Sequence, residues 1–424
     1  ELLDKIRDRQ ALISVIGLGY VGLPLAVMFS ESGFYVQGID IDQTKVDSIN
    51  SGESYIEDVE SSQLTNVTRK EGTGKLFATT DFGVLCESDV VIICVHTPLS
   101  KTKDPDVSHI LAAVNEISSR VTKDALIVLE STTYPGTTLE LVLPILENQA
   151  QAQDRKLGSN IFLAFSPERI DPGQSEWTIS NTPKVIGGVT ANCTEVASAL
   201  YGSIVNKVVP VSSPTVAEMV KLLENTYRAT NTALVNEVAI MCDRLGVDVW
   251  EIIEAAKTKP FGFMPFYPGP GLGGHCIPVD PQYLAWKMKT LNYNARFIQL
   301  AEEINLSMPE FWVSKIQAKL NDQGKPVKQS EILVLGVSYK KDVSDTRESP
   351  ALDVIKHLLD KGALVSYFDS RVSEIWVEQT RLHSIDDGEL ASRIGGADCV
   401  VILTDHSDIE WNVVRDNAIA IVDT

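Results

Sequence analysis

Short apolar runs alternate with amphipathic segments over the first part of the chain. Residues 11–16 (ALISVI) predict a buried parallel strand, a helical segment continues to about Ser32, and residues 34–40 (FYVQGID) predict a second strand that ends in an acid. Further apolar, β-branched runs predict strands at 89–95, 125–130 and 161–165. Strands and helices that alternate in this way indicate a doubly wound sheet.

The periodicity changes after about residue 211. Residues 214–246 place apolar side chains mostly three, four or seven positions apart, with no internal Gly or Pro before Gly246. This predicts one helix of roughly 30 residues, longer than most globular helices, of the kind that joins domains or forms a dimer interface. A rigid loop rich in Pro, Gly and aromatic residues follows at 260–274, and helical patterning resumes over 281–320.

The strand–helix–strand pattern returns beyond residue 321. Strands are expected at 331–337, 363–369 and 399–403, with a helix over 349–361. The predicted fold class is therefore α/β, with two Rossmann-like doubly wound domains joined by a long central helix and a helical region. The predicted domain boundaries are 1–211, 212–320 and 321–424.

Composition narrows the classes of partner. The 424 residues are 44% hydrophobic and 22% charged, which is ordinary for a globular protein of two to three domains. Because 57 acidic residues outnumber 37 basic ones, the net charge is −20, and neither nucleic acid nor an anionic membrane is an expected partner. Six scattered cysteines without a CxxC pair argue against a disulfide framework or a zinc site, so a reducing cytoplasm is expected and no metal is predicted.

A dinucleotide site is predicted directly after the first strand. Gly17, Gly19 and Gly22 form GxGxxG between a strand and a helix, where the glycines permit a tight turn, the approach of a pyrophosphate and close helix–strand packing. Asp40 ends the next strand, 23 residues after Gly17, and its carboxylate favours NAD over NADP because it would repel a 2′-phosphate. The expected cofactor-binding residues here are Gly17, Gly19, Tyr20, Val21, Gly22, Asp40 and Lys45.

Cys276 is the candidate nucleophile. It follows two glycines in a loop, precedes a predicted helix start near Pro281, and has Asp280 four residues further along to assist proton transfer. A buried structural thiol is an equally good interpretation of these residues alone. Lys221 and Asn225 lie at i and i+4 on the long helix, a pair that stabilises an oxyanion if it is not simply a solvated helix face.

Polar residues also follow several predicted strands. Thr97, the Glu130–Thr133 segment and the Glu168–Arg169 pair each lie just beyond a strand, where ligands of open α/β sheets bind. Near the start of the helix at Ser349, the cationic residues Lys340, Lys341 and Arg347 suit a phosphate.

Six motifs in order resemble the UDP-glucose/GDP-mannose dehydrogenase family over nearly the whole chain. They are VIGLGYVGLPLA at 15–26, ESTTYPGTT at 130–138, FSPERIDPG at 165–173, EMVKLLENTYRATN at 218–231, PGPGLGGHCIPVDP at 268–281 and LGVSYKKDVSDTRESP at 335–350. Four of them, those at 130–138, 165–173, 268–281 and 335–350, look most like the UDP-N-acetylglucosamine 6-dehydrogenase branch, which supplies aminouronic acids for bacterial surface polysaccharides.

The resemblance implies a four-electron oxidation of a sugar C6 alcohol to a carboxylate with two NAD⁺. In that scheme Cys276 forms a thiohemiacetal and then a thioester, Lys221 and Asn225 stabilise the oxyanion, and Asp280 serves as base. Glu168 assists hydrolysis and Thr132 positions water. The implied substrate-binding residues are Glu168, Arg169, Lys221, Asn225, Phe266, Tyr267, Gly273 and Lys340, and the implied further cofactor contacts are Thr97, Ser131, Thr132 and Arg347.

The resemblance also implies a UDP-sugar substrate and a homodimer or higher homo-oligomer. Within the family, the alternative substrates are UDP-N-acetylgalactosamine, UDP-glucose, UDP-N-acetylmannosamine and GDP-mannose. Two sequence features depart from the common family pattern: PERIDPG replaces PEFLxEG, and Lys257 and Lys259 stand where many members have an arginine. His275 in GGHC has no assigned role. A single-step β-hydroxyacid dehydrogenase, which needs no thiol, and a non-enzymatic NAD sensor are the rival classes.

Overall fold

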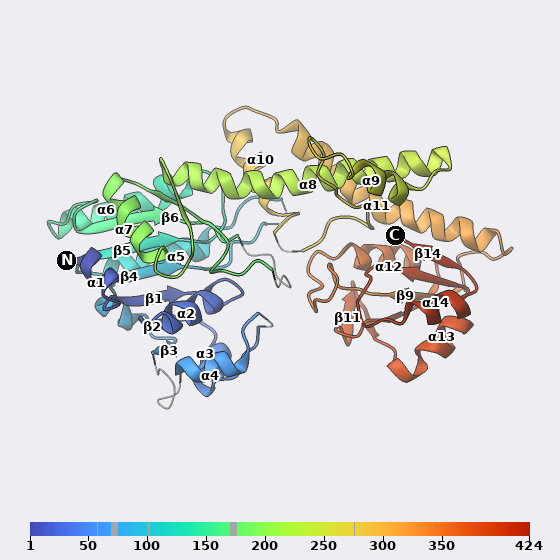
Figure 1. Cartoon of the computed structure of the whole chain (residues 1–424), viewed down its shortest axis with the longest axis horizontal. Helices are drawn as coiled ribbons and strands as arrows, with labels where there is room; N and C mark the ends of the chain where they lie inside the picture. Colours follow the sequence, from blue (N-terminus) through green and yellow to red (C-terminus); the bar gives the residue numbers. More distant parts are fainter. Residues whose placement is uncertain (57, 69–74, 101, 170–175, 275) are drawn as a thin grey trace. The chain divides into compact units, whose positions relative to one another are not determined.

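The computed structural model describes residues 1–56, 58–68, 75–100, 102–169, 176–274 and 276–424 of the chain (Figure 1). The chain forms two compact units. Unit 1 comprises Glu1–Leu223 with Trp286–Leu291, and unit 2 comprises Glu224–Ala285 with Asn292–Thr424.

Unit 1 is built on an eight-stranded sheet with the order β3-β2-β1-β4-β5-β6-β7-β8. All neighbouring strands are parallel except β6 and β7. The strands are β1 (Leu12–Ile16), β2 (Tyr35–Ile39), β3 (Leu76–Thr79), β4 (Val90–Ile93), β5 (Ala125–Leu129), β6 (Ile161–Phe165), β7 (Lys184–Gly188) and β8 (Val208–Val211). The helices are α1 (Leu2–Arg7), α2 (Gly22–Glu31), α3 (Gln43–Ser51), α4 (Ser61–Thr68), η1 (Phe82–Glu87), α5 (Ser108–Arg120), η2 (Thr138–Val142), α6 (Leu143–Ala152) and α7 (Ala191–Tyr201).

Both faces of this sheet are buried, and this explains the continuous apolar runs in its strands. In β4, Val90 and Ile92 join the cluster that contains α2 and α7, while Val91 and Ile93 join the one that contains α5 and α6. The predicted strands are confirmed, although the observed strands end one or two residues earlier than several of the apolar runs.

The predicted long helix is confirmed as α8 (Pro214–Leu245), 32 residues that begin in unit 1 and continue into unit 2. α9 (Val249–Ala256) follows it. The helical region expected over 281–320 forms two helices, α10 (Asp280–Thr290) and α11 (Arg296–Asn321). Asn292, with φ of +56°, lies between them, and asparagine tolerates this left-handed conformation better than most residues do.

The sheet of unit 2 repeats the central strand order of unit 1. Its order is β10-β9-β13-β14, all parallel, which corresponds to β2-β1-β4-β5. The strands are β9 (Glu331–Leu335), β10 (Leu364–Phe368), β13 (Cys399–Ile402) and β14 (Ile421–Asp423), with a separate hairpin of β11 (Glu374–Val377) and β12 (Thr380–His383). The helices are α12 (Pro350–Asp360), η3 (Asp387–Glu389), α13 (Leu390–Gly396) and α14 (Trp411–Asn417).

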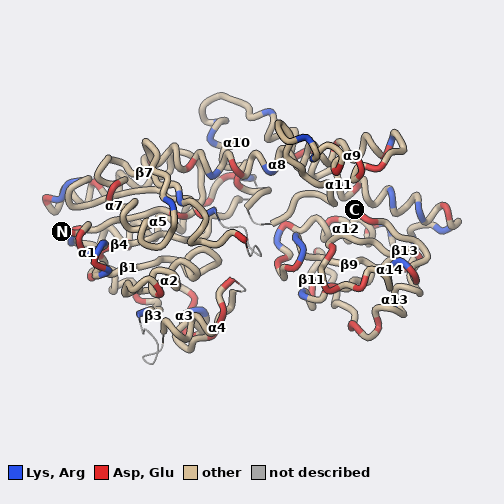
Figure 2. Tube along the Cα trace, viewed as in Figure 1, with Lys and Arg blue, Asp and Glu red and all other residues tan. Residues whose placement is uncertain are grey.

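The α/β fold predicted from the sequence is thus observed in both units. Lys and Arg are interspersed with Asp and Glu along the trace (Figure 2). In the part of the chain that the structure describes, no helix is long and apolar enough to span a membrane.

Candidate active site

The glycine turn between β1 and α2 has the geometry that a pyrophosphate requires. Gly17 has φ of +90°, and a Cβ there would lie 2.6 Å from the Cys94 carbonyl oxygen. A Cβ on Gly22 would lie 1.8 Å from the Gly17 carbonyl oxygen, whereas a Cβ on Gly19 would meet no atom of the described residues within 4 Å. The protein's own packing therefore requires the first and third glycines, and the second leaves open space for a ligand.

The remaining residues of the turn lie at the start of α2. Val21 is the residue before the helix, and the Tyr20 side chain is exposed beside it. The N-terminus of α2 offers backbone N–H groups to an anion. This arrangement fits a dinucleotide phosphate held by main-chain donors.

Asp40 is buried just after β2 and holds the glycine turn. Its Oδ2 accepts from the Leu18 N–H at 2.9 Å, and its Oδ1 accepts from the Asp42 N–H at 3.0 Å. The Lys45 Nζ lies 3.4 Å from Oδ2. A carboxylate has about four acceptor positions, so Asp40 retains capacity for ribose hydroxyls in addition to these bonds.

The loops after β4 and β5 are joined at the carboxyl edge of the sheet. The Thr97 hydroxyl donates to the Thr132 carbonyl at 2.6 Å, and the Ser131 hydroxyl donates to the Val95 carbonyl at 2.8 Å. Because β1 and β4 are neighbours from which the chain proceeds in opposite directions, this edge is the switch point where ligands of such sheets bind. Three predicted cofactor residues thus share one edge with the glycine turn.

Glu168 follows β6 and contacts a lysine that sequence reasoning missed. Lys184, the first residue of β7, has its Nζ 3.4 Å from Glu168 Oε2 and 2.9 Å from Glu130 Oε2. The adjacent Arg169 donates through Nη1 to the Pro183 carbonyl at 2.6 Å. The rest of the FSPERIDPG motif, residues 170–173, lies outside the described residues.

Glu218 attaches the ESTTYPGTT loop to α8. Its buried carboxylate accepts from the Gly136 N–H at 2.5 Å and from the N–H and hydroxyl of Thr138 at 2.9 and 2.7 Å. Burial raises the pKa of Glu218 despite these bonds. Lys221, buried one helical turn later, is held by the same part of α8. The available signal for Glu218 was its position three residues before Lys221, on the same side of the helix.

In unit 2, Cys276 lies just before the N-terminus of α10. The Cys276 carbonyl accepts from the Asp280 N–H at 2.8 Å, and its thiol belongs to a partly exposed residue. Asn225 of α8 donates through Nδ2 to Asp280 Oδ2 at 2.5 Å. The structure therefore brings together three of the predicted catalytic residues, since Asp280 is bonded to Cys276 through the backbone and to Asn225 through its side chain. The neighbouring His275 lies outside the described residues.

The loop before Cys276 packs against the segment that carries Lys340 and Arg347. A Cβ on Gly273 would lie 2.7 Å from the Tyr339 Cβ, so only glycine fits there without displacement. The Gly274 N–H donates to the Arg347 carbonyl at 3.2 Å, and the Arg347 guanidinium pairs with Asp345 at 2.7 Å. The Ser338 hydroxyl donates to the Lys340 carbonyl at 2.8 Å. The Cys276 loop and the predicted substrate segment are thus one packed region of unit 2.

The aromatic pair predicted to bind substrate packs on helices. The Phe266 ring lies 5.7 Å from the Tyr227 ring of α8. The Tyr267 ring stacks on Trp250 of α9 at 5.7 Å, and its hydroxyl donates to Glu254 at 2.9 Å. Their contact with a substrate stays a prediction.

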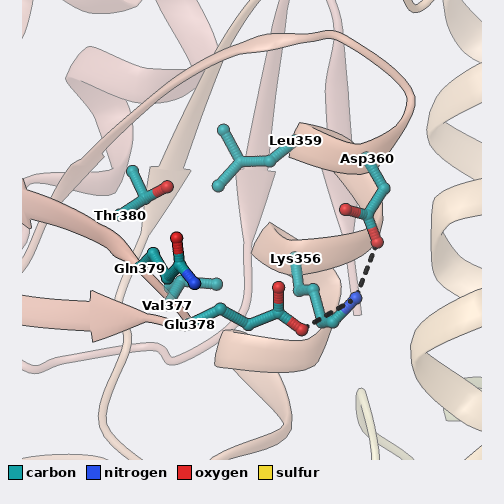
Figure 3. A pocket seen from close by; sticks show the side chains of 7 residues that line it. All are labelled: Lys356, Leu359, Asp360, Val377, Glu378, Gln379 and Thr380. Carbon is teal, nitrogen blue, oxygen red and sulfur yellow. Dashed lines mark hydrogen bonds and ion pairs between the residues drawn. The ribbon is translucent and has the colours of Figure 1, made fainter.

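A shallow depression of about 290 Å³ lies at the other end of α12 from this region (Figure 3). Lys356 bridges Asp360 at 2.7 Å and Glu378 at 3.3 Å there, so its charge is already paired. None of the predicted site residues lines the depression. Within the described residues no cluster of His, Cys, Asp and Glu has the arrangement of a metal site.

The sequence of this chain matches one family of proteins along most of its length. The patterns of the NAD binding, central and UDP binding domains of the UDP-glucose/GDP-mannose dehydrogenase family match residues 11–205, 215–307 and 333–424. The UDP-N-acetyl-D-mannosamine dehydrogenase of Methanococcus maripaludis is 38% identical, over 96% of this chain and 88% of the relative. The UDP-N-acetyl-D-glucosamine 6-dehydrogenase of Pseudomonas aeruginosa is 33% identical, over 94% of this chain and 91% of the relative.

The fold agrees with the sequence similarity. The structure of the UDP-D-ManNAc dehydrogenase from Pyrococcus horikoshii superposes with a TM-score of 0.85 at 34% identity, over 97% of this chain and 94% of that one. The glycine turn with Asp40 then falls in the family's NAD binding domain, and the segment with Lys340 and Arg347 falls in its UDP binding domain. The chain belongs to the UDP-glucose/GDP-mannose dehydrogenase family and is an NAD-dependent oxidoreductase of that family.

Proposed function

We propose that this chain is a UDP-N-acetylhexosamine 6-dehydrogenase that oxidises the C6 alcohol to a carboxylate through a thioester on Cys276. The observation that carries the proposal is the arrangement at the start of α10, where the partly exposed residue Cys276 lies four residues before an aspartate that is bonded to Asn225. A single-step dehydrogenase has no use for a thiol at this place, and a non-enzymatic NAD sensor has no use for the whole arrangement.

NAD supplies the hydride acceptor for each of the two oxidations. Asp280 takes the alcohol proton, assisted by the amide of Asn225, which fixes its carboxylate. The Cys276 thiolate then adds to the aldehyde, and the resulting hemiacetal oxygen is stabilised by donors from the Lys221 ammonium and the Asn225 amide. Loss of the second hydride leaves the sugar acyl group on sulfur.

Glu168 and Thr132 serve the hydrolysis of this thioester. Glu168 accepts a proton from water while the water oxygen attacks the acyl carbon, the C–S bond breaks, and the Cys276 thiolate leaves. Thr132, whose carbonyl is fixed by Thr97, helps to orient the water. Arg169, Phe266, Tyr267 and Gly273 are proposed substrate contacts, and Lys340 binds the nucleotide-sugar.

The observations that bear on the identity of the sugar favour different substrates. The residues of four motifs favour UDP-N-acetylglucosamine. The 38% identical relative from Methanococcus maripaludis, in contrast, is named a UDP-N-acetyl-D-mannosamine dehydrogenase. UDP-N-acetylglucosamine and UDP-N-acetylmannosamine are therefore both candidate substrates, with UDP-N-acetylgalactosamine and UDP-glucose as alternatives. The product would enter surface polysaccharides made from cytoplasmic precursors.

A panel of nucleotide sugars tests this proposal. The purified full chain is incubated with NAD and each of the four UDP-sugars or GDP-mannose, and kcat/KM is measured from NADH absorbance. We expect one of the two candidate N-acetylhexosamines to exceed UDP-glucose by at least about tenfold, ~1.4 kcal/mol of transition-state binding. A higher kcat/KM for UDP-glucose or GDP-mannose, or no turnover of any of the five, would contradict it.

A further inference from the structure

Lys184 lies between two carboxylates that belong to different motifs. Its side chain is 6% exposed, and its Nζ lies 2.9 Å from Glu130 Oε2 and 3.4 Å from Glu168 Oε2. Glu130 is fully buried at the end of β5, whereas Glu168 is 14% exposed after β6. One cation in the sheet of unit 1 is thus shared by an interior acid and an acid that reaches the surface.

The buried groups of this cluster, Glu130, Lys184 and Tyr201, are partners of one another. The Tyr201 hydroxyl of α7 donates to Glu130 Oε1, and the Lys184 ammonium also lies 5.2 Å from the centre of the Tyr201 ring. Burial disfavours the ammonium, but the charges of Glu130 and Glu168 outweigh it and hold the pKa of Lys184 above its ordinary value. Burial raises the pKa of Glu130, and Lys184 and Tyr201 act against this.

Ion pairs in the interior rarely increase stability, because removing two charges from water costs about as much as their attraction returns. A purely structural pair also needs only one acid. The second acid, Glu168, is the residue to which the proposed function assigns thioester hydrolysis. Among the described residues, Cys94 just after β4 and Tyr201 also act on this cluster, and Arg169 is adjacent to Glu168 in the chain.

We propose that Lys184 is a positioning residue for the hydrolysis step: its ammonium fixes the Glu168 carboxylate and keeps it ionised, while Glu130 competes for the same ammonium. The inference rests on the proposed function, since Glu168 needs its negative charge only if it removes a proton from water. A general base works only when unprotonated, so the charges around Glu168 set the lowest pH at which hydrolysis runs.

The two neighbours of Glu168 therefore have opposite effects. Lys184→Met removes the cation, which disfavours the ionised Glu168 and moves the acid limb of hydrolysis to higher pH by about one unit. Glu130→Gln keeps an oxygen acceptor for Lys184 and Tyr201 but removes a competing charge, so the acid limb moves to lower pH. Lys184→Arg retains the cation and should stay within a few tenths of a unit of the wild type.

The hydrolysis step is measured directly in the full-length protein. Enzyme is mixed with NAD and the preferred UDP-sugar, quenched in acid at intervals, and the acyl group on Cys276 is followed by intact mass between pH 5 and 9. Opposite shifts of the decay rate in Lys184→Met and Glu130→Gln support the proposal. An acid limb that does not move in a folded Lys184→Met protein would overturn it.

Glu130→Gln decides the matter if Lys184→Met does not fold. In that case a downward shift of the acid limb supports the proposal, and an unchanged or upward limb overturns it. Failure of the proposed function gives a different result, because wild-type enzyme would then form no acyl adduct on Cys276 at any pH. Retention of the wild-type KM for NAD in each variant shows that the cofactor site is intact.

Discussion

In the proposed function Cys276 forms the covalent intermediate, and the residues around it fix the backbone of its loop. The carbonyl of Cys276 is fixed by the Asp280 N–H, and Gly273 and Gly274 bring the loop into close contact with Tyr339. The backbone is thus held on both sides, while the side chain stays partly accessible. The sequence could indicate the loop, but not that Asn225 of α8 is the partner of Asp280.

Replacing the sulfur of Cys276 by oxygen tests whether the thiol is the nucleophile. Cys276→Ser substitutes a much weaker nucleophile, so we expect carboxylate formation to fall by at least about 1000-fold, ~4 kcal/mol, while NAD affinity is unchanged. Product is quantified by chromatography and NAD affinity by calorimetry. Cys86→Ser, which alters an exposed thiol in unit 1, is the matched control and should retain full activity. Comparable turnover of Cys276→Ser would remove the thiol from the mechanism.

Site residues that belong to one local motif could be predicted from the sequence. Contacts between residues far apart in the sequence could not. Gly17, Gly19 and Asp40 were identified because a strand–turn–helix pattern defines their places within a short segment. Lys184 lies 54 residues from Glu130, and Glu218 lies 82 residues from Gly136. No local pattern relates positions that far apart, so only the folding of unit 1 brings these partners together.

At the scale of elements, α8 was the most predictable feature and also presents an unexplained surface. Exposed apolar side chains recur along it four or seven positions apart, and form one stripe on the helix. The stripe consists of Leu223, Tyr227, Leu234, Met241 and Leu245. Stripes of this period commonly pack against another helix, so we propose that the homo-oligomer implied by the resemblance forms through this stripe.

A single charge in the stripe tests that assembly. Leu234→Arg places a cation at a 57% exposed apolar position, and we expect the oligomer to weaken by at least about tenfold in its dissociation constant, ~1.4 kcal/mol. Molar mass is measured by light scattering over a dilution series. Ile419→Arg, at a 60% exposed apolar position of unit 2 outside the stripe, should leave the mass unchanged. A monomeric wild type, or a Leu234→Arg mass equal to that of wild type, would contradict the role of the stripe.

At the scale of the whole molecule, the same kind of glycine turn follows the first strand of each sheet, β1 and β9. Gly336 has φ of +79° after β9, and a Cβ there would lie 2.3 Å from the Thr404 carbonyl oxygen, much as Gly17 faces Cys94. Asp369 accepts from the Val337 N–H at 2.8 Å, as Asp40 accepts from Leu18. Although burial opposes its ionisation, hydrogen bonds from His406, Val337 and Arg371 lower the pKa of Asp369.

This repetition was visible in the sequence as a return of the strand–helix–strand pattern, because hydrophobic periodicity reports burial directly. The boundaries at 211/212 and 320/321 stay predictions: the change of periodicity after about residue 211 marks the start of α8, and this helix continues from one compact unit into the other. The net charge of −20 predicts that no broad basic surface exists, but it carries no information on where single cations lie. Arg347 and Lys341, for example, are each paired with an aspartate.

The central claim is that one sugar loses four electrons on a single protein through an acyl group on Cys276. The most direct measurement supplies a limiting amount of the preferred UDP-sugar with excess NAD, counts NADH by absorbance, and assays for aldehyde with a carbonyl-trapping reagent. The account predicts two NADH and one carboxylate per sugar, with no free aldehyde. One NADH per sugar, with the aldehyde as product, would contradict it.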